Sequence, residues 1–485
     1  SSPGAFDQPP PKVPEGLGQA THHAAIGQLT RPFEATALAC MQFWSVLWPY
    51  WWRPAGKASE CPTPRRHLMS ITDGHELVSA QAYGEHGVPH DIWTHLRAES
   101  PVHRCEPELF EPFWAITKHA DISEISRSPE RFLSEPGITV LNRGQQDALE
   151  SSAFNSMRVI IQMDPPEHRE VRKVSSHVFT PRAIRALDAD IDRSAREVVD
   201  RLAGDSGEGE CEFASDVAAA HPLRILSSML GVPREQEPDI LRLTNELFAF
   251  DDPDLQRQGV DRQQAVMDLG MELYTLLDSI VQDRRANPTS DLASVLANAT
   301  IDGEPLGPME TIGYYLIIFS AGHDTTKNAL VGGMRAFLEH PDEFRKLQDH
   351  PELVESAVEE VIRWTSPVNY MKRTAAVDTV IRGQGIAEGE SVVLFYASAN
   401  RDEDVFDDPF DFRIDRDPNR HIGFGIGEHF CLGAHMARRS QRALLLELAQ
   451  RLEWAELAGE PEQIHSAFVV GLKRLPMRYR IRSAA

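Results

Sequence analysis

The chain has 485 residues, of which 41 % are hydrophobic and 25 % are charged, and its formal net charge is −24. These values are ordinary for a globular protein and exclude a disordered chain, a collagen-like chain and a multi-span membrane protein. A chain this acidic is a poor general ligand for nucleic acid, which attracts clustered Lys and Arg. Its five widely spaced cysteines form no CxxC pair, so they argue against a disulfide scaffold and predict a reducing, cytoplasmic setting.

Residues 1–74 are predicted to form a flexible leader followed by an aromatic-rich segment. Pro, Gly, His and Gln dominate the first thirty residues. Residues 33–52 then hold four of the eight tryptophans and one charged residue, Glu34. Because Trp and Tyr at this density suit an interface, three interpretations stand: a helix on the protein's own surface, a weak membrane-surface contact, or a helix that docks a partner.

Residues 75–485 are predicted to form a single, mainly helical domain with small β-sheets. Apolar residues recur at helical spacing over 182–203, 264–285, 308–339, 351–365 and 433–453. Short runs of apolar residues predict strands at 112–116, 379–382 and 391–395. The Gly- and acid-rich stretch at 204–210 is expected to be a surface loop.

The most informative stretch is F-G-I-G-E-H-F-C-L-G, from Phe424 to Gly433, with a helical pattern directly after it. Glycines let the backbone turn tightly and aim N–H groups at an anion, and a cysteine before a helix feels the positive end of the helix dipole. Both effects stabilise a thiolate, which is a suitable axial ligand for haem iron. The weaker alternative, which gives the glycines no role, is a zinc cluster of Cys431 with His421, His429 and His435.

Two further patterns carry polar groups on helices. The apolar helix around 314–330 holds Asp324, Thr325 and Thr326 near its middle, and polar groups in a buried helix are costly unless paired or functional. An acid beside a hydroxyl can relay protons, although a satisfied Thr and a salt-bridged Asp are the simpler alternative. Glu360 and Arg363 lie three apart on one helix face and can pair.

These motifs, in this order, resemble those of the cytochrome P-450 family, and in particular its soluble bacterial terpene, alkane and steroid hydroxylases. The stretch ending in Cys431 is similar to the family's haem-ligand signature. The other matching motifs are M-D-P-P-E-H-R at 163–169, A-G-H-D-T-T at 321–326 and E-V-I-R at 360–363. The resemblance covers roughly residues 75–480 and implies an α-rich triangular prism that encloses haem b.

The resemblance also implies a role for each motif residue. Cys431 would ligate the iron, and Asp324 and Thr325 would deliver protons. Glu360 and Arg363 would form a buried structural network, with Arg416 and His421 both candidates for its third member. Contacts with the haem or its propionates are implied for His168, Arg172, Ala321, Arg373, Phe424, His429, Cys431 and Gly433.

The implied activity is a haem-thiolate monooxygenase, an oxidoreductase that hydroxylates a lipophilic small molecule with O2. Electrons would come from an external ferredoxin and its ferredoxin reductase, since the sequence shows no flavin fingerprint and no spare cysteines for an iron–sulfur cluster. A terpenoid or steroid substrate is favoured, with a fatty acid or an alkane as the alternative. The sequence also permits a peroxygenase, a nitric-oxide-reducing relative or a haem sensor; the first two have no need of the Asp324–Thr325 pair.

Apolar residues near these motifs are predicted to line the substrate pocket, with Asn369 as a polar group that orients the ligand. A basic patch of Arg169, Lys173, Arg438 and Arg439 is predicted to dock an acidic ferredoxin in spite of the overall charge. The pocket residues predicted are Ile317, Ile318, Ala321, Val368, Asn369, Tyr370, Met371, Phe468 and Val469.

Overall fold

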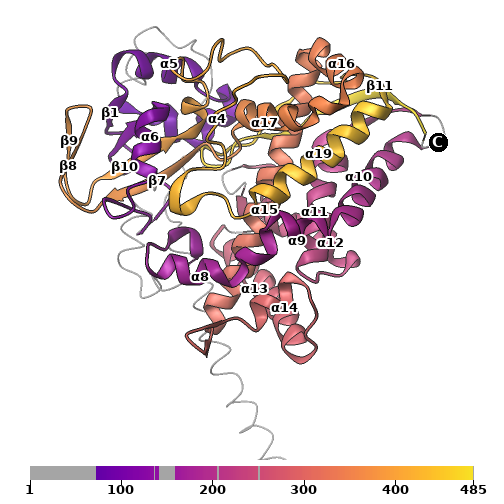
Figure 1. The fold of residues 1–485 in the computed structure, drawn as a ribbon, viewed down its shortest axis with the longest axis horizontal. Helices are drawn as coiled ribbons and strands as arrows, with labels where there is room; N and C mark the ends of the chain where they lie inside the picture. Colours follow the sequence, from indigo (N-terminus) through magenta and orange to yellow (C-terminus); the bar gives the residue numbers. More distant parts are fainter. Residues whose placement is uncertain are drawn as a thin grey trace, which may run out of the picture.

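The computed structural model describes residues 73–135, 137–140, 159–204, 207–248, 252–260 and 262–483. The predicted leader and the aromatic segment at 33–52 therefore lie outside the described residues. Within the described part, every helix is too short or too polar to cross a bilayer. Figure 1 shows a β-rich part and a larger helical part, with the 32-residue helix α15 (Pro308–Glu339) running through the middle of the molecule.

Helices make up most of the described chain. Those before α15 are α3 (His75–Val78), α4 (Ala80–His86), α5 (His90–Glu99), α6 (His119–Ser126), α8 (Glu167–Ser176), α9 (Pro181–Arg185), α10 (Asp188–Ala203), α11 (Ala220–Met229), α12 (Glu237–Phe248), α13 (Arg262–Ala286) and α14 (Leu292–Ala297). Those after it are α16 (Pro341–Asp349), α17 (Val354–Thr365), α18 (Tyr396–Ala399) and α19 (Ala434–Arg451). Short 3₁₀ or π turns are η1 (Ile160–Gln162), η2 (His177–Phe179), η3 (Ala214–Ala219), η4 (Arg234–Gln236), η5 (Pro351–Leu353) and η6 (Gly427–His429).

The predicted helices are confirmed, with two refinements at their ends. The prediction for 308–339 matches α15, and those for 264–285 and 433–453 match α13 and α19 within two residues. The pattern at 182–203 is divided into α9 and α10 by a turn at residues 186 and 187. The pattern at 351–365 begins as the 3₁₀ turn η5, with Pro351 at its first position, and continues as α17.

A five-stranded sheet forms the centre of the β-rich part. Its order is β1 (Val102–Cys105), β2 (Phe113–Ile116), β10 (Ser391–Phe395), β7 (Tyr370–Ala375) and β3 (Phe132–Leu133). The central strand β10 is parallel to β2, antiparallel to β7 and buried along its whole length, as its continuous apolar run requires. The remaining strands are β4 (Glu208–Glu212), β5 (Thr300–Ile301), β6 (Glu304–Pro305), β8 (Thr379–Ile381), β9 (Gln384–Ile386), β11 (Leu452–Leu457), β12 (Glu462–Gln463), β13 (Leu472–Arg474) and β14 (Pro476–Ile481).

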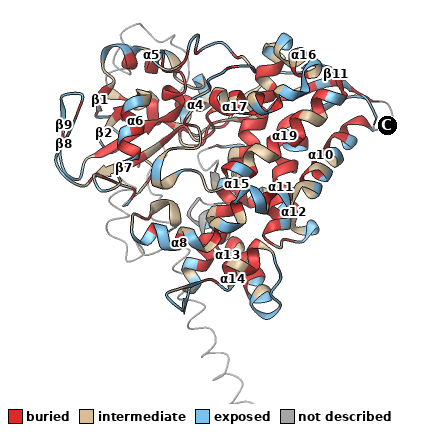
Figure 2. Ribbon diagram, in the orientation of Figure 1, coloured by how far each residue is buried: buried red, intermediate tan, exposed pale blue. Residues whose placement is uncertain are grey.

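The stretch at 204–210 is only partly the loop that its composition predicts. Residues from Glu208 onward form β4, which pairs antiparallel with β14. A partner strand far away in the sequence supplies the hydrogen bonds that make this polar stretch a strand. Figure 2 shows buried residues in the five-stranded sheet and along α15 and α19, and these belong to separate hydrophobic clusters on the two sides of the molecule.

Candidate active site

The loop before α19 holds Cys431 in a fixed turn. Gly425 and Gly427 have positive φ angles of 69° and 77°, and a side chain at Gly427 would also collide with the carbonyl oxygen of Ser126 at the end of α6. The Cys431 N–H donates to the Phe424 carbonyl at 2.9 Å, which closes the loop. These constraints explain why glycines recur in this stretch, and they place Cys431 just ahead of the first turn of α19.

The surroundings of Cys431 act on its thiol in opposite directions. Burial raises the pKa of the Cys431 thiol, whereas the N–H of Gly433 and the charges of Arg172 and Arg438 lower it, and the net result is a raised pKa. A thiolate here therefore needs a cation to bind it. Of the three cysteines in the described part of the chain, Cys431 is the one that lines the central cavity.

That cavity encloses about 1540 Å³ of space, part of it open to solvent. The Cys431 loop and α19 supply one group of its walls, and the middle of α15, with Ala321 and Thr325, supplies another. Its lining is mainly apolar. All eight residues for which the resemblance implies a haem contact line it: His168, Arg172, Ala321, Arg373, Phe424, His429, Cys431 and Gly433.

Two of these residues are buried polar groups that lack the partner one expects for them. Arg373, on β7, is 5 % exposed, and within the described residues its guanidinium donates to the carbonyl of Lys372 at 2.8 Å. No carboxylate among the described residues lies within ion-pair distance of it, and burial lowers the pKa of Arg373. His168, on α8, is 1 % exposed, and its Nδ1 atom has no hydrogen-bond partner among the described residues. A buried cation without a carboxylate partner and a buried ring nitrogen without a hydrogen-bond partner, both on the wall of the cavity in the described part of the chain, point to an anionic ligand.

Two more nitrogen-bearing side chains complete this corner of the cavity. The ring of His429 lies 4.2 Å from the ring of His168, and its Nε2 atom is 2.9 Å from the hydroxyl of Ser134. Burial first, and then the charge of Arg373, lower the pKa of His429 to about 2, so the ring is neutral. Arg172 donates to the Phe430 carbonyl at 2.6 Å. Haem carries two propionates, so this set of residues, together with a thiol on the same cavity, fits a haem.

Comparison with known proteins agrees with this geometry. The family model described as Cytochrome P450 matches residues 114–481, more than half of the chain. This chain belongs to the cytochrome P450 family. It is therefore a haem-thiolate enzyme, an oxidoreductase that incorporates one oxygen atom, and its cofactor is haem b.

Individual P450s match over most of their length. Cytochrome P450-terp from a Pseudomonas species is 36 % identical over 413 residues, which cover 83 % of this chain and 96 % of that protein. The steroid C26-monooxygenase of Rhodococcus jostii is 33 % identical, and the match covers 85 % of this chain and 86 % of that protein. A crystal structure of a P450 from Novosphingobium aromaticivorans superimposes with a TM-score of 0.76 at 37 % identity, covering 84 % of this chain and 98 % of that one.

In this P450 the acid and the hydroxyl on α15 have different surroundings. Thr325 lines the cavity, and its hydroxyl donates to the Ala321 carbonyl at 2.7 Å. Asp324 does not line the cavity; it is buried and pairs with Lys327, one turn along the helix. The helix is continuous through both residues. The salt-bridged Asp324 and the hydrogen-bonded Thr325 agree with the simpler alternative, and the proton relay stays a prediction.

The network around Glu360 has a definite third member. Glu360 and Arg363 are both 0 % exposed and share two hydrogen bonds of 2.7 Å. Arg416 donates its Nε–H to Glu360 at 3.2 Å, so it, and not His421, completes the network. His421 binds the neighbouring carboxylate, Glu359, at 2.9 Å.

The predicted substrate residues divide into two groups. Ile317, Ile318, Ala321, Val368 and Met371 line the cavity. Asn369, Tyr370, Phe468 and Val469 do not, which corrects that part of the prediction.

Each of these four side chains has other contacts. The Asn369 amide donates to the Tyr83 hydroxyl at 2.8 Å and the Ala467 carbonyl at 2.7 Å, so it joins core segments instead of orienting a ligand. Tyr370 and Phe468 pack edge-to-face on each other in a core on one face of the sheet. Val469 is buried where its backbone bridges to Val368.

Several cavity residues carried no motif in the sequence. Pro222, Ile225 and Leu226 of α11 and Phe179 of η2 face the cavity although they lie far before α15 in the sequence. Ser134, which contacts His429, is 295 positions away from it. These residues reach the site through packing of distant helices, so no local pattern could have identified them.

The predicted basic patch is largely neutralised. Arg169 pairs with Glu428, Lys173 with Glu170, Arg438 with Glu359, and Arg439 with Asp188 and Asp192. All four cations therefore have carboxylate partners on this protein, which corrects the expectation that they present a free positive surface.

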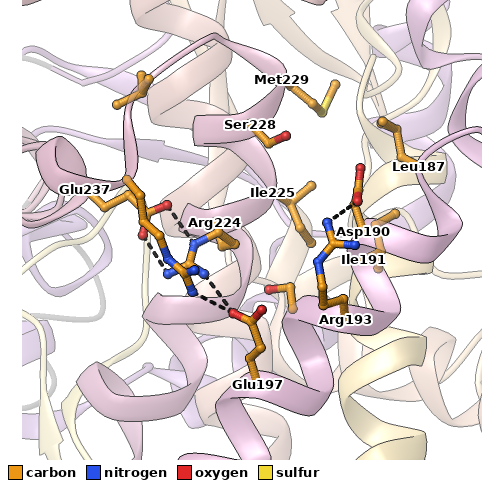
Figure 3. A pocket seen from close by; sticks show the side chains of 13 residues that line it. Leu187, Asp190, Ile191, Arg193, Glu197, Arg224, Ile225, Ser228, Met229 and Glu237 are labelled. Atoms are coloured by element: carbon orange, nitrogen blue, oxygen red, sulfur yellow. Dashed lines mark hydrogen bonds and ion pairs between the residues drawn. The ribbon is translucent and has the colours of Figure 1, made fainter.

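A second pocket, of about 810 Å³, lies between α10, α11 and η4. Figure 3 shows that its charged side chains bind one another: Arg224 lies between Glu197 and Glu237, and Arg193 pairs with Asp190. With its charges satisfied, this pocket offers no reactive group.

The zinc interpretation also fails, because the described residues contain no cluster of three or more metal-ligating side chains.

Proposed function

We propose that this P450 hydroxylates a lipophilic small molecule, with a terpenoid or steroid favoured and a fatty acid or alkane as the alternative. When bound, the haem supplies the activation of O2 and the insertion of one oxygen atom into a C–H bond. The observation that carries the proposal is that one mainly apolar cavity is bordered by a cysteine thiol, by an anion cradle and by a threonine hydroxyl.

In this proposal the sulfur of Cys431 would hold the iron of the haem. The hydrogen bond from its N–H to the Phe424 carbonyl fixes the backbone, and the Gly433 N–H and the start of α19 favour a negative sulfur. Arg373 and His168 would hold one propionate edge of the cofactor, with Arg172 and His429 beside them.

Thr325 and Asp324 are the proposed route for protons. The Thr325 hydroxyl donates its proton to the Ala321 carbonyl, so its oxygen can accept a hydrogen bond from a group in the cavity. Asp324 would pass protons to Thr325 once its ion pair with Lys327 opens. Proton transfer therefore requires the Asp324 carboxylate to leave Lys327.

The substrate class is supported by the walls of the cavity and by the relatives. The α15 residues Ile317, Ile318 and Ala321, together with Val368 and Met371, present hydrocarbon. One similar protein is named for oxidation of a steroid. We propose an external ferredoxin as the electron donor, approaching the Cys431 loop.

An optical titration of the purified haem-loaded protein tests the substrate. A terpene, a steroid, a fatty acid and an alkane are added separately, and the Soret band is followed for a shift from low to high spin. We expect terpenes or steroids to produce the shift at the lowest concentration. A shift with fatty acids or alkanes alone would support the alternative, and a haem protein that no lipophile shifts would contradict the hydroxylase proposal.

A further inference from the structure

A partly buried carboxylate on α17, Glu359, ties together the two segments that flank Cys431. Arg438 of α19 donates to it through Nε at 2.6 Å and through Nη2 at 2.8 Å. His421, at the start of the Cys431 loop, lies 2.9 Å away through Nε2. We call Glu359, His421 and Arg438 the proximal cluster.

The bonding pattern inside the proximal cluster fixes its charges. The Nδ1 atom of His421 accepts the Gly423 N–H at 3.2 Å, so Nε2 carries the proton that points to Glu359. Burial raises the pKa of Glu359, but the hydrogen bonds from Arg438 and His421 outweigh it and bring the pKa to about 2. Glu359 is therefore an anion and Arg438 a cation, and together they are neutral.

The proximal cluster reaches the cavity through one aromatic ring. The Arg438 guanidinium carbon lies 4.4 Å from the centre of the Phe424 ring, within the range of a cation–π contact. Phe424 borders the cavity, and its carbonyl accepts the Cys431 N–H. Arg439, the next residue along α19, points elsewhere and pairs with Asp188 and Asp192 of α10. Arg438 is thus the one of the two that contacts the ring beside the thiol.

We propose that the proximal cluster sets the reduction potential of the haem iron, with Arg438 as a positioning residue that acts through Phe424 and with Glu359 as its counter-charge. Charges act strongly in a partly buried site, and the surroundings of a ligating sulfur are a main determinant of a haem potential. Removing the cation leaves an uncompensated anion, which disfavours the added electron; removing the anion does the reverse. The inference rests on Cys431 as the axial ligand.

The test is a spectroelectrochemical titration of the holoenzyme and four variants. We expect Arg438→Gln to lower the potential, Glu359→Gln to raise it, and Arg439→Gln to leave it at the wild-type value. Arg438→Lys keeps the charge and should lie closer to the wild type than Arg438→Gln. Opposite signs are the critical result, since damage to the fold would move both cluster variants in the same direction.

Two outcomes would overturn the proposal. Shifts of the same sign in Arg438→Gln and Glu359→Gln would contradict it, and so would shifts no larger than that of Arg439→Gln. The ferrous–CO spectrum, recorded on every sample, separates this failure from that of the underlying assignment. Absence of the Soret band of thiolate ligation from the wild type would contradict Cys431 as ligand. If the wild type has that band but the two cluster variants do not shift the potential in opposite directions, only the role of the proximal cluster is contradicted.

Discussion

Thr325 and Asp324 are neighbours in the sequence, but each has a different environment. The Thr325 hydroxyl faces the cavity, and the Asp324 carboxylate is held by Lys327 on the same helix. Thr326 provides a comparison, because it too lines the cavity and donates to the carbonyl four residues earlier, that of Gly322 at 2.9 Å. Proton delivery in our account depends on Thr325 and Asp324 and not on Thr326.

Substitution of these residues separates proton delivery from binding. We expect Asp324→Asn to lower the rate of product formation by about a hundredfold, the scale of general acid catalysis, while the substrate-induced Soret shift persists. Thr325→Ala should divert reducing equivalents from product to peroxide, and Thr326→Ala should do neither. Product and peroxide are measured per O2 consumed. Equal behaviour of the two threonine variants would contradict the assignment of Thr325.

At the scale of elements, Glu360 and Arg363 connect α17 to the segment that follows α18 through buried hydrogen bonds. Glu360 receives hydrogen bonds from the buried side chains of Arg363 and Arg416 and from the backbone N–H of the partly buried Arg413. Removal of a buried charge that has such partners leaves the partners uncompensated, which costs more than the pair itself contributes.

We therefore expect Glu360→Gln to lower the free energy of unfolding by about 3–5 kcal/mol. Glu355→Gln is the matched control on the same helix, since Glu355 is exposed and its pair with Arg442 should contribute about 0–1 kcal/mol. Urea denaturation measures both. A loss for Glu360→Gln as small as that of the control would contradict a structural role for the network.

His221 connects three helices and titrates in an unusual range. Its Nδ1 atom lies 2.9 Å from the Ser194 hydroxyl and its Nε2 atom 3.0 Å from the Ser440 carbonyl, and burial lowers the pKa of His221 to about 4. Between pH 6.5 and 4 the unfolded chain therefore binds a proton at this residue that the folded protein does not. The free energy of unfolding should fall with falling pH over this window, by about 1.4 kcal/mol per pH unit from this histidine.

His221→Gln should reduce the slope of unfolding free energy against pH by the contribution of one proton, about 1.4 kcal/mol per pH unit, whatever its effect on stability at neutral pH. The measurement is a series of urea denaturations between about pH 4 and pH 7 on the wild type and the variant. An unchanged slope would show that His221 is protonated in the folded protein.

The sequence predicted most of the site because its motifs are local. The loop of Cys431, the helical pair His168 and Arg172, and the middle of α15 each lie on one short segment whose spacing sets their geometry. The run from Val368 to Met371 was harder to interpret, because strand β7 turns successive side chains to opposite faces. Met371 and Arg373 face the cavity, whereas Tyr370 faces the core. Contacts that join distant segments, such as Ser134 with His429 or β4 with β14, leave no local signal.

At the scale of the whole molecule, an electron donor must find a route past an acidic surface. The four cations predicted for that task are paired with carboxylates, but two others near the Cys431 loop are not. These are Arg127 and Arg420, which are exposed and have no carboxylate partner among the described residues. The backbone of Arg127, at the end of α6, lies against Gly427, and the carbonyl of Arg420 is hydrogen-bonded to the His119 ring. Phe430, 41 % exposed, provides an apolar contact beside them.

We predict that Arg127→Glu and Arg420→Glu together slow reduction by an acidic ferredoxin by about tenfold at low salt, with the difference shrinking as salt increases. The affinity for substrate should not change. Arg193→Glu, in the pocket of Figure 3, is a charge-reversal control away from the loop. Stopped-flow reduction measures the rates, and equal slowing by the control would indicate only a general effect of net charge.

The most direct test of the account is the ferrous–CO spectrum of the wild type beside Cys431→Ser and Cys211→Ser. Cys211 lies on β4, away from the cavity, and burial raises the pKa of its thiol to about 12, so it serves as the matched control. We predict the Soret band of thiolate ligation in the wild type and in Cys211→Ser, and its loss in Cys431→Ser. Retention of that band without Cys431 would contradict the assignment on which the proposed chemistry depends.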